Sequence, residues 1–156
     1  KRSALAVEFL KCWQDQEDFG AEVHLIGSLP EGLVLPANSN WTLHPRLPDA
    51  EYAHLMAKAR VLVYFSDYEG FGMPPVEAVF GGAAAVYSDI PATTEVMEGT
   101  GFSFRNDSFE SFVSAMRGAL ASTPGTIRDW QARLRARHSW EKVANIVADE
   151  LSTLSD

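Results

Sequence analysis

Apolar positions along this chain recur with two different periods, and these periods predict its secondary structure. Leu5, Phe9 and Trp13 fall four residues apart, which places them on one face of an amphipathic helix over residues 4–16. Residues 61–65 are apolar without interruption, as is typical of a strand covered on both faces. Similar patterns predict strands over 22–26, 40–43, 83–87 and 101–104, and helices over 50–59, 74–80, 92–98, 109–121, 126–137 and 139–153, with Asp49 and Ser108 as N-caps.

The predicted strands and helices alternate about five times, an order typical of α/β proteins. Right-handed crossovers in such proteins build a parallel sheet with helices on both faces. We therefore expect an α/β fold with the 61–65 strand in the middle of its sheet. Ligands of these sheets bind at the carboxyl ends of the strands, so the residues that follow this strand are the first candidates for a site.

Residues 66–78 combine glycines, prolines and carboxylates at one loop-to-helix junction. Gly70 and Gly72 let the backbone approach a ligand closely. The proline pair that follows starts a helix, and the first amides of a helix, together with its dipole, attract anions. Glu69 and Glu77 flank this position, and carboxylates accept hydrogen bonds from sugar hydroxyls. The combination predicts a site for a nucleotide diphosphate sugar.

Simpler interpretations of the same carboxylates remain open at this point. Glu69 would be a solvated loop residue, and Glu77 a glutamate near the helix start that suits the helix dipole. Acidic residues at 67–69 and 15–17 resemble metal ligands only superficially, because carboxylates so spaced are common. The sequence offers no cluster of histidines and cysteines for a transition metal. We therefore expect no metal ion at this site.

Composition and charge restrict the class of partner. The chain has 156 residues, enough for one domain with a sizeable core, and 46% of them are hydrophobic. Its net charge of −8 argues against a nucleic-acid surface, which needs a basic face. A single cysteine excludes an intramolecular disulfide, and no run of about 20 apolar residues predicts a transmembrane helix. The chain opens on Lys1 and Arg2 without a signal-peptide core, which we interpret as a cut through a larger protein.

The junction and its surroundings resemble a known enzyme family. The order strand–Ser–x–x–Glu–Gly–Phe–Gly–x–Pro–x–x–Glu–Ala over 61–78 is similar to the donor-binding motif of retaining glycosyltransferases of the GT-B fold, the large family-4 group. Residues 24–27, 41–49 and 81–89 resemble strands and turns of the same family, so the likeness covers nearly the whole chain. It implies the C-terminal half of a GT-B fold, a Rossmann-like parallel sheet with helices on both faces.

The resemblance also implies roles for individual residues. Glu69 matches the first motif glutamate, which bonds hydroxyls of the donor sugar in the family, and we expect it to be catalytic. Glu77 matches the second glutamate, which holds the ribose hydroxyls. The family's turn that meets sugar and phosphates corresponds to Gly70, Phe71 and Gly72. Its basic residues at the diphosphate correspond to Lys1 and Arg2, and its position that packs on the nucleobase corresponds to Leu47.

By the same resemblance, residues 1–156 form a single nucleotide-sugar-binding domain whose C-terminal helices over 126–156 cross toward an N-terminal acceptor domain. The expected activity is hexosyl transfer with retention, from a nucleotide diphosphate sugar to an acceptor hydroxyl, in polysaccharide or lipopolysaccharide biosynthesis. We expect no cofactor besides this donor, a cytoplasmic location, and at most peripheral contact with the inner membrane face. This domain alone is expected to bind nucleotide weakly and to transfer no sugar.

Two other functions remain open. The chain would be a non-catalytic nucleotide-binding or interaction module that kept the fold, or a related GT-B enzyme such as a sugar epimerase or a phosphorylase. The motif region lacks a lysine suited to anchoring pyridoxal phosphate, which argues against a phosphorylase. Convergence of Glu69, Glu77 and a basic side chain in one cleft would distinguish the enzyme from the binding module.

Overall fold

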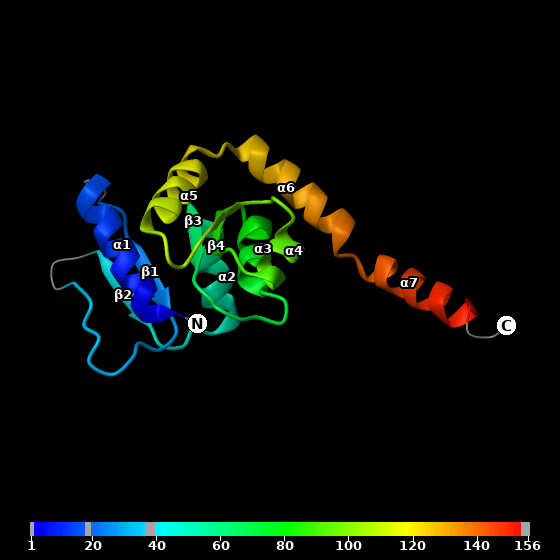
Figure 1. Cartoon of the computed structure of the whole chain (residues 1–156), viewed down its shortest axis with the longest axis horizontal. Helices are drawn as coiled ribbons and strands as arrows, with labels where there is room; N and C mark the ends of the chain where they lie inside the picture. Colours follow the sequence, from blue (N-terminus) through cyan, green and yellow to red (C-terminus); the bar gives the residue numbers. More distant parts are fainter. Residues whose placement is uncertain (1, 18–19, 37–39, 154–156) are drawn as a thin grey trace.

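The computed structural model describes residues 2–17, 20–36 and 40–153, which form parallel strands flanked by helices (Figure 1). Lys1 lies outside the described residues, so its predicted role has no structural counterpart. The helices are α1 (Ser3–Glu17), α2 (Asp49–Lys58), α3 (Met73–Gly81), α4 (Pro91–Met97), α5 (Phe109–Ala121), α6 (Pro124–Arg137) and α7 (Trp140–Thr153). The strands are β1 (Val23–Ile26), β2 (Trp41–His44), β3 (Val61–Tyr64), β4 (Ala84–Ser88) and β5 (Phe102–Phe104). Each predicted helix and strand is present, and its ends differ from the prediction by at most two residues.

The described strands pair in parallel, as predicted, but they form two sheets. β1 pairs with β2, and the second sheet has the order β3–β4–β5. All five residues of β4 are buried, whereas the first three residues of β3 are only half-buried. The prediction that 61–65 runs through the middle of a sheet is therefore wrong. Within the described residues β4 is the central strand, and β3 is an edge strand of its sheet.

A cavity of about 970 Å³ lies between the two sheets. All of β1 and the first three residues of β3 line it, and α1 and α2 contribute further walls. The apolar sequence of β3 is explained by this cavity together with the packed side chains around it. An uninterrupted apolar run reports an apolar environment, but it does not say whether a neighbouring strand provides that environment.

The two predicted N-caps have different outcomes. The hydroxyl of Ser108 accepts a hydrogen bond from the amide of Ser111 at 3.2 Å, so Ser108 caps α5 as predicted. Asp49 is instead the first residue of α2, and Pro48 occupies the cap position without a side-chain bond. The prediction for Asp49 is therefore wrong. Its carboxylate still lies in the first helical turn, where it interacts favourably with the helix dipole.

Aromatic rings form the core on one side of the larger sheet. Phe9 of α1, Phe65 after β3 and Phe104 of β5 surround Phe112 of α5, with ring centroids 5.3–5.5 Å from its own. Phe104 and Phe112 are fully buried. Edge-on and tilted ring pairs stabilise a core beyond the area that they bury. The cluster therefore fixes α1 and α5 against the sheet that carries the junction.

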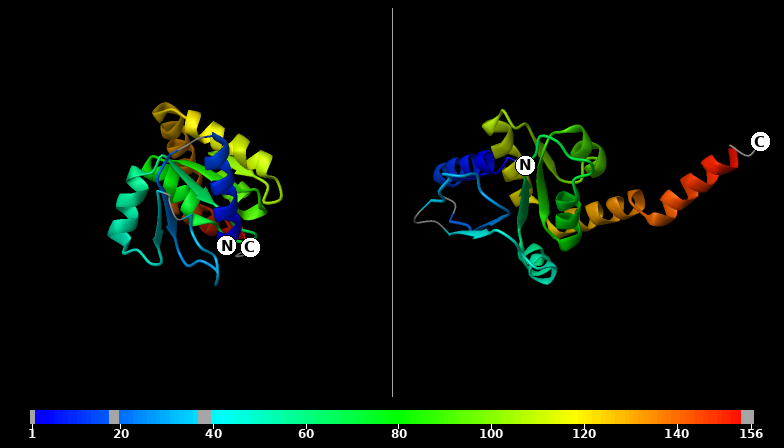
Figure 2. Two further views of the ribbon diagram at one scale, coloured as in Figure 1. Left: turned by 90° about the vertical axis from the view of Figure 1, so that its left-hand side faces the viewer. Right: turned by 90° about the horizontal axis from the view of Figure 1, so that it is seen from below.

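The two C-terminal helices differ in their contacts. α6 buries three apolar side chains, and Gln131 donates a hydrogen bond to the carbonyl of Val79 in α3 at 2.9 Å. α7 extends away from both sheets (Figure 1, Figure 2), and its half-exposed apolar side chains are Val143, Ile146 and Val147. α6 thus belongs to the packed domain, while a crossing of α7 toward another domain stays a prediction. Within the described ranges, no helix is long and apolar enough to cross a membrane.

The turn before β5 requires a glycine. Gly101 has a φ of +117°, and a Cβ there would lie 2.7 Å from the carbonyl oxygen of Ala85. That oxygen belongs to the backbone of β4 and cannot rotate away. We expect Gly101→Ala to lower the free energy of unfolding by about 2–4 kcal/mol in urea denaturation, through overpacking and backbone strain. Gly20→Ala is the control, because a Cβ at Gly20 meets nothing within 4 Å; equal effects of the two substitutions would contradict the argument.

Candidate functional site

The loop over 66–72 leaves the carboxyl end of β3 and enters α3. Gly72 is the N-cap of α3 with a φ of 83°, and a Cβ there would lie 2.9 Å from Thr93 Cγ2, so glycine is required. Pro74 lies in the first turn of α3, and no side chain caps this helix. Pro74 and Pro75 carry no N–H, so the amides at this helix start are those of Gly72 and Met73, at the positive end of the helix dipole, which suits an anion.

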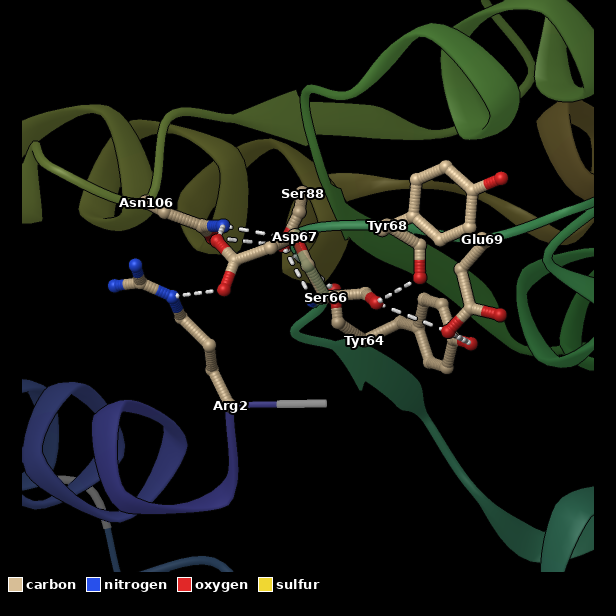
Figure 3. Close-up of polar contacts among 8 residues, drawn as sticks. All are labelled: Arg2, Tyr64, Ser66, Asp67, Tyr68, Glu69, Ser88 and Asn106. Atoms are coloured by element: carbon tan, nitrogen blue, oxygen red, sulfur yellow. Dashed lines mark hydrogen bonds and ion pairs between the residues drawn. The ribbon is translucent and has the colours of Figure 1, made fainter.

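Glu69 is held by two hydroxyl groups (Figure 3). Tyr64 OH donates to Glu69 Oε1, and Ser66 Oγ donates to the same oxygen at 2.9 Å. Tyr64 and Ser66 are buried, with 7% and 0% exposure, while Glu69 is half-buried. This carboxylate is therefore anchored from the protein interior. Its anchoring disfavours the interpretation of Glu69 as a solvated loop residue.

Glu77 is held by a hydroxyl from a different element. Tyr52 of α2 donates to Glu77 Oε2 at 2.7 Å, and both residues are half-buried. Burial and then the hydrogen bond to Glu77 raise the pKa of Tyr52 well above its usual range. Burial and the bond to Glu69 raise the pKa of Tyr64 likewise, with a smaller electrostatic contribution from Tyr52. Each glutamate of the junction thus has its own tyrosine partner, and the two tyrosines interact electrostatically.

Arg2 lies on the other side of Ser66 and Asp67 from Glu69 and is paired with a carboxylate (Figure 3). Its Nε is 2.6 Å from Asp67 Oδ2, and its backbone amide donates to the carbonyl of Phe65 at 3.3 Å. Asn106 Nδ2 donates to Asp67 Oδ1 at 3.2 Å. The guanidinium of Arg2, with help from Asn106, holds the pKa of Asp67 below its usual range. A basic group therefore lies at the carboxyl end of β3, and an anionic ligand would compete for it with Asp67.

Hydrogen bonds between three strand ends fix the start of the loop. The amide of Ser66 donates to Ser88 Oγ at 2.9 Å, and Ser88 Oγ donates to Asn106 Oδ1 at 2.8 Å. Asn106 Nδ2 donates to the carbonyl of Ser66 at 2.9 Å, which closes the ring. Ser66 and Ser88 are fully buried, so water competes little for these bonds. The loop with Glu69 therefore leaves β3 in one defined direction.

Sequence reasoning missed four of these contributors: Tyr52, Tyr64, Asp67 and Asn106. Tyr64 and Asn106 had a usable signal, because each carries a polar group at or just after the carboxyl end of a strand, where parallel strands meet. Tyr52 had no such signal in the sequence, since its bond to Glu77 depends on how α2 packs beside α3. Asp67 was considered only as part of an acidic triplet, and its pairing with Arg2 joins residues far apart in the sequence.

The remaining predicted residues lie in two different places. Gly70 and Phe71 border a surface cavity of about 380 Å³, and the Phe71 ring stands edge-on to His138 with centroids 5.4 Å apart. Leu47 lines the large cavity between the sheets, whose described lining residues include none from 66–78. The structure thus places Leu47 at a different cavity from Gly70 and Phe71. Among the described residues, no three His, Cys, Asp or Glu side chains gather in a way that would hold a metal ion.

Fold and site together define a Rossmann-like α/β domain with two anchored carboxylates at a strand–turn–helix junction. The family model of the glycosyl transferases group 1 matches residues 3–122. Because this match covers most of the chain, the protein belongs to the glycosyl transferases group 1 family. The matched range runs from α1 through α5 and includes both glutamates. The resemblance predicted from the motif is confirmed.

Two curated relatives are O-antigen enzymes. The chain is 32% identical over 98 residues to the O-antigen chain mannosyltransferase RfbU of Salmonella typhimurium, a match over 63% of this chain and 27% of that protein. It is 42% identical over 55 residues to the O-antigen chain mannosyltransferase B of Escherichia coli, over 35% of this chain and 14% of that protein. The matched part therefore spans about a quarter or less of the length of these relatives.

Tyrosine ionisation offers a test of the two anchoring pairs. Burial raises the pKa of Tyr87 to about 12, and the pKa values of Tyr52 and Tyr64 lie higher still. We expect these three side chains to stay protonated in the folded protein well above pH 10, where unfolded tyrosines ionise. A raised folded-state pKa favours the neutral form, so its stabilisation is complete below about pH 10 and is lost as the pH rises further. Tyrosinate absorbance of the folded protein measures the ionisation, and urea unfolding measures the stability, both from about pH 8 to about pH 11, on either side of the usual tyrosine pKa. Ionisation of all tyrosines near pH 10 without unfolding would contradict both expectations.

Proposed function

We propose that this chain is the donor-binding domain of a retaining glycosyltransferase that takes a nucleotide diphosphate sugar. The observation that carries the proposal is the pair of anchored carboxylates, Glu69 and Glu77, at the uncapped start of α3. The carboxylates accept hydrogen bonds from hydroxyl groups, and the helix start attracts phosphate. A ligand with hydroxyls on both sides of a diphosphate matches this order of groups.

In this proposal each group has a separate task. Glu77 accepts hydrogen bonds from the ribose hydroxyls, and Glu69 accepts hydrogen bonds from hydroxyls of the donor sugar near the reacting carbon. The amides of Gly70 and Gly72 and the start of α3 stabilise the negative charge that develops on the departing diphosphate, which is the main electrostatic task of the reaction. Arg2 adds a positive charge from the carboxyl end of β3. The donor is a substrate, and we propose neither a metal ion nor a separate cofactor.

The relatives support a more specific donor and pathway. Both are named as O-antigen chain mannosyltransferases, so we propose that a mannosyl unit is transferred in the assembly of a related surface polysaccharide. Their greater length supports an acceptor-binding part outside this chain, with α7 reaching toward it. We therefore propose that the chain binds nucleotide weakly and has no turnover by itself; measurable sugar transfer by the purified chain would contradict this. A cytoplasmic location with peripheral membrane contact stays a prediction.

Titration with nucleotides tests the donor site directly. Isotope-labelled protein is titrated with UDP, GDP, ADP and their sugars, and shifts are mapped onto residues 69–77. We expect Glu77→Gln to weaken binding of the preferred nucleoside diphosphate by about ten-fold or more, because it removes a charged acceptor. Glu69→Gln should leave the nucleoside diphosphate unaffected and reduce only the additional affinity that the sugar provides.

Glu110→Gln serves as the control in that titration. Glu110 is an exposed acid in the first turn of α5, outside the junction, so its substitution should change neither affinity. If no nucleotide perturbs residues 69–77, the donor-site proposal is wrong. If nucleoside diphosphate binds but Glu69 never responds to the sugar, the sugar-binding role of Glu69 is wrong.

The pairing of Arg2 with Asp67 generates a second prediction for this site. Asp67→Asn removes the carboxylate that competes with the diphosphate for Arg2. We expect the nucleoside diphosphate to bind roughly two- to five-fold more tightly, with a gain that shrinks as salt is added. Asp107→Asn is the matched control, because Asp107 is an exposed acid paired with Arg105 at 3.6 Å. Unchanged or weaker binding by Asp67→Asn would contradict a role for Arg2 at the diphosphate.

A further inference from the structure

Two tyrosines outside the glycine-containing turn make direct bonds to its two glutamates. Tyr52 comes from α2 and Tyr64 from the last position of β3, whereas Glu69 lies in the loop and Glu77 in α3. Each tyrosine hydroxyl donates to one carboxylate. The first bond joins α2 to α3, and the second joins the end of β3 to the loop that follows it.

The physical setting makes both hydroxyls effective anchors. Tyr64 is buried and Tyr52 is half-buried, so each phenol ring is held by packing before its hydroxyl reaches a carboxylate. Both hydroxyls are protonated, and thus donating, across the neutral range, as in any tyrosine, and burial extends this to higher pH. A glutamate side chain has several rotatable bonds, and a donor fixed by packing selects one orientation among them.

Tyr87 differs from the two tyrosines that bond the glutamates. Tyr87 is as buried as Tyr64, with 2% exposure, and the main cause of its raised pKa is burial, with Asp89 as the contributing charge. Neither glutamate of the junction affects it. Burial is therefore the main influence on Tyr87. Tyr52 and Tyr64, by contrast, each direct a hydroxyl at the carboxylate that the proposed function needs.

We propose that Tyr52 and Tyr64 are positioning residues, which orient Glu77 toward the nucleotide and Glu69 toward the sugar. This inference rests on the proposed function and deepens it. Because the two carboxylates bind different parts of one ligand, their anchors have separable effects. Loss of the Tyr52 hydroxyl weakens every nucleotide ligand, and loss of the Tyr64 hydroxyl weakens only those that carry a sugar.

Tyrosine-to-phenylalanine variants test this separation, since they remove one hydroxyl and keep the ring. We expect Tyr52→Phe to weaken nucleoside diphosphate and nucleotide sugar equally, by roughly five- to ten-fold. Tyr64→Phe should bind nucleoside diphosphate as the unmodified chain does and lose most of the additional affinity for the sugar. Tyr87→Phe is the matched control for a buried tyrosine and should change neither affinity.

A second readout separates positioning from packing. A double-variant comparison provides this readout, because Tyr52 bonds Glu77 directly. A purely packing role for Tyr52 would weaken binding further even when Glu77 has already been replaced. In the double variant Tyr52→Phe/Glu77→Gln, binding should be no weaker than in Glu77→Gln alone, because the hydroxyl acts through that carboxylate.

The outcomes distinguish this inference from the proposed function. If the unmodified chain binds none of the nucleotides, the proposed function is wrong and the inference falls with it. If the unmodified chain binds and both tyrosine variants bind equally well, the inference alone is wrong. Equal losses in Tyr52→Phe, Tyr64→Phe and Tyr87→Phe would also overturn it, because they would indicate a general loss of packing.

Discussion

The parallel pairing of β3, β4 and β5 is the constraint on which the rest of this structure depends. It brings three strand ends to one edge, where Ser66, Ser88 and Asn106 share buried hydrogen bonds. A shift of one strand by one residue would turn Ser88 to the opposite face and break these bonds. The direction of the loop, the place of Glu69 and the entry into α3 follow from this register.

The proposed donor site sets a second requirement, because its anionic ligand has to bind to a protein of net charge −8. The junction carries two glutamates, and Asp67 lies close by, so a phosphate depends on local positive groups. The start of α3 supplies one through its amides, and Arg2 supplies another. Hydroxyl groups of Tyr52, Tyr64 and Ser66 donate hydrogen bonds to the two glutamate carboxylates and so stabilise their negative charge. Local arrangement therefore matters more at this site than net charge.

Most secondary structure could be predicted because it depends on local pattern, whereas several contacts could not. The apolar run at 61–65 indicated a strand but not its place in the sheet, since a cavity and a neighbouring strand select the same side chains. The cap at Ser108 was predictable from sequence, while Asp49 had equal capping chemistry and was displaced by Pro48. The bond from Tyr52 to Glu77 left no local trace, because it depends on the packing of α2 beside α3.

The sequence by itself determined the class of this protein and predicted a chemistry for its junction. Two glycines, a proline pair and two glutamates in residues 66–78 sufficed for that, because turns, helix starts and acceptor groups are properties of neighbouring residues. Tertiary structure decided which groups hold those glutamates and that Arg2 pairs with Asp67. It also decided that Leu47 lines the cavity between the two sheets, away from the cavity at Gly70 and Phe71. Those relations join residues distant along the chain, and only the packing of helices and strands brings such residues within bonding distance.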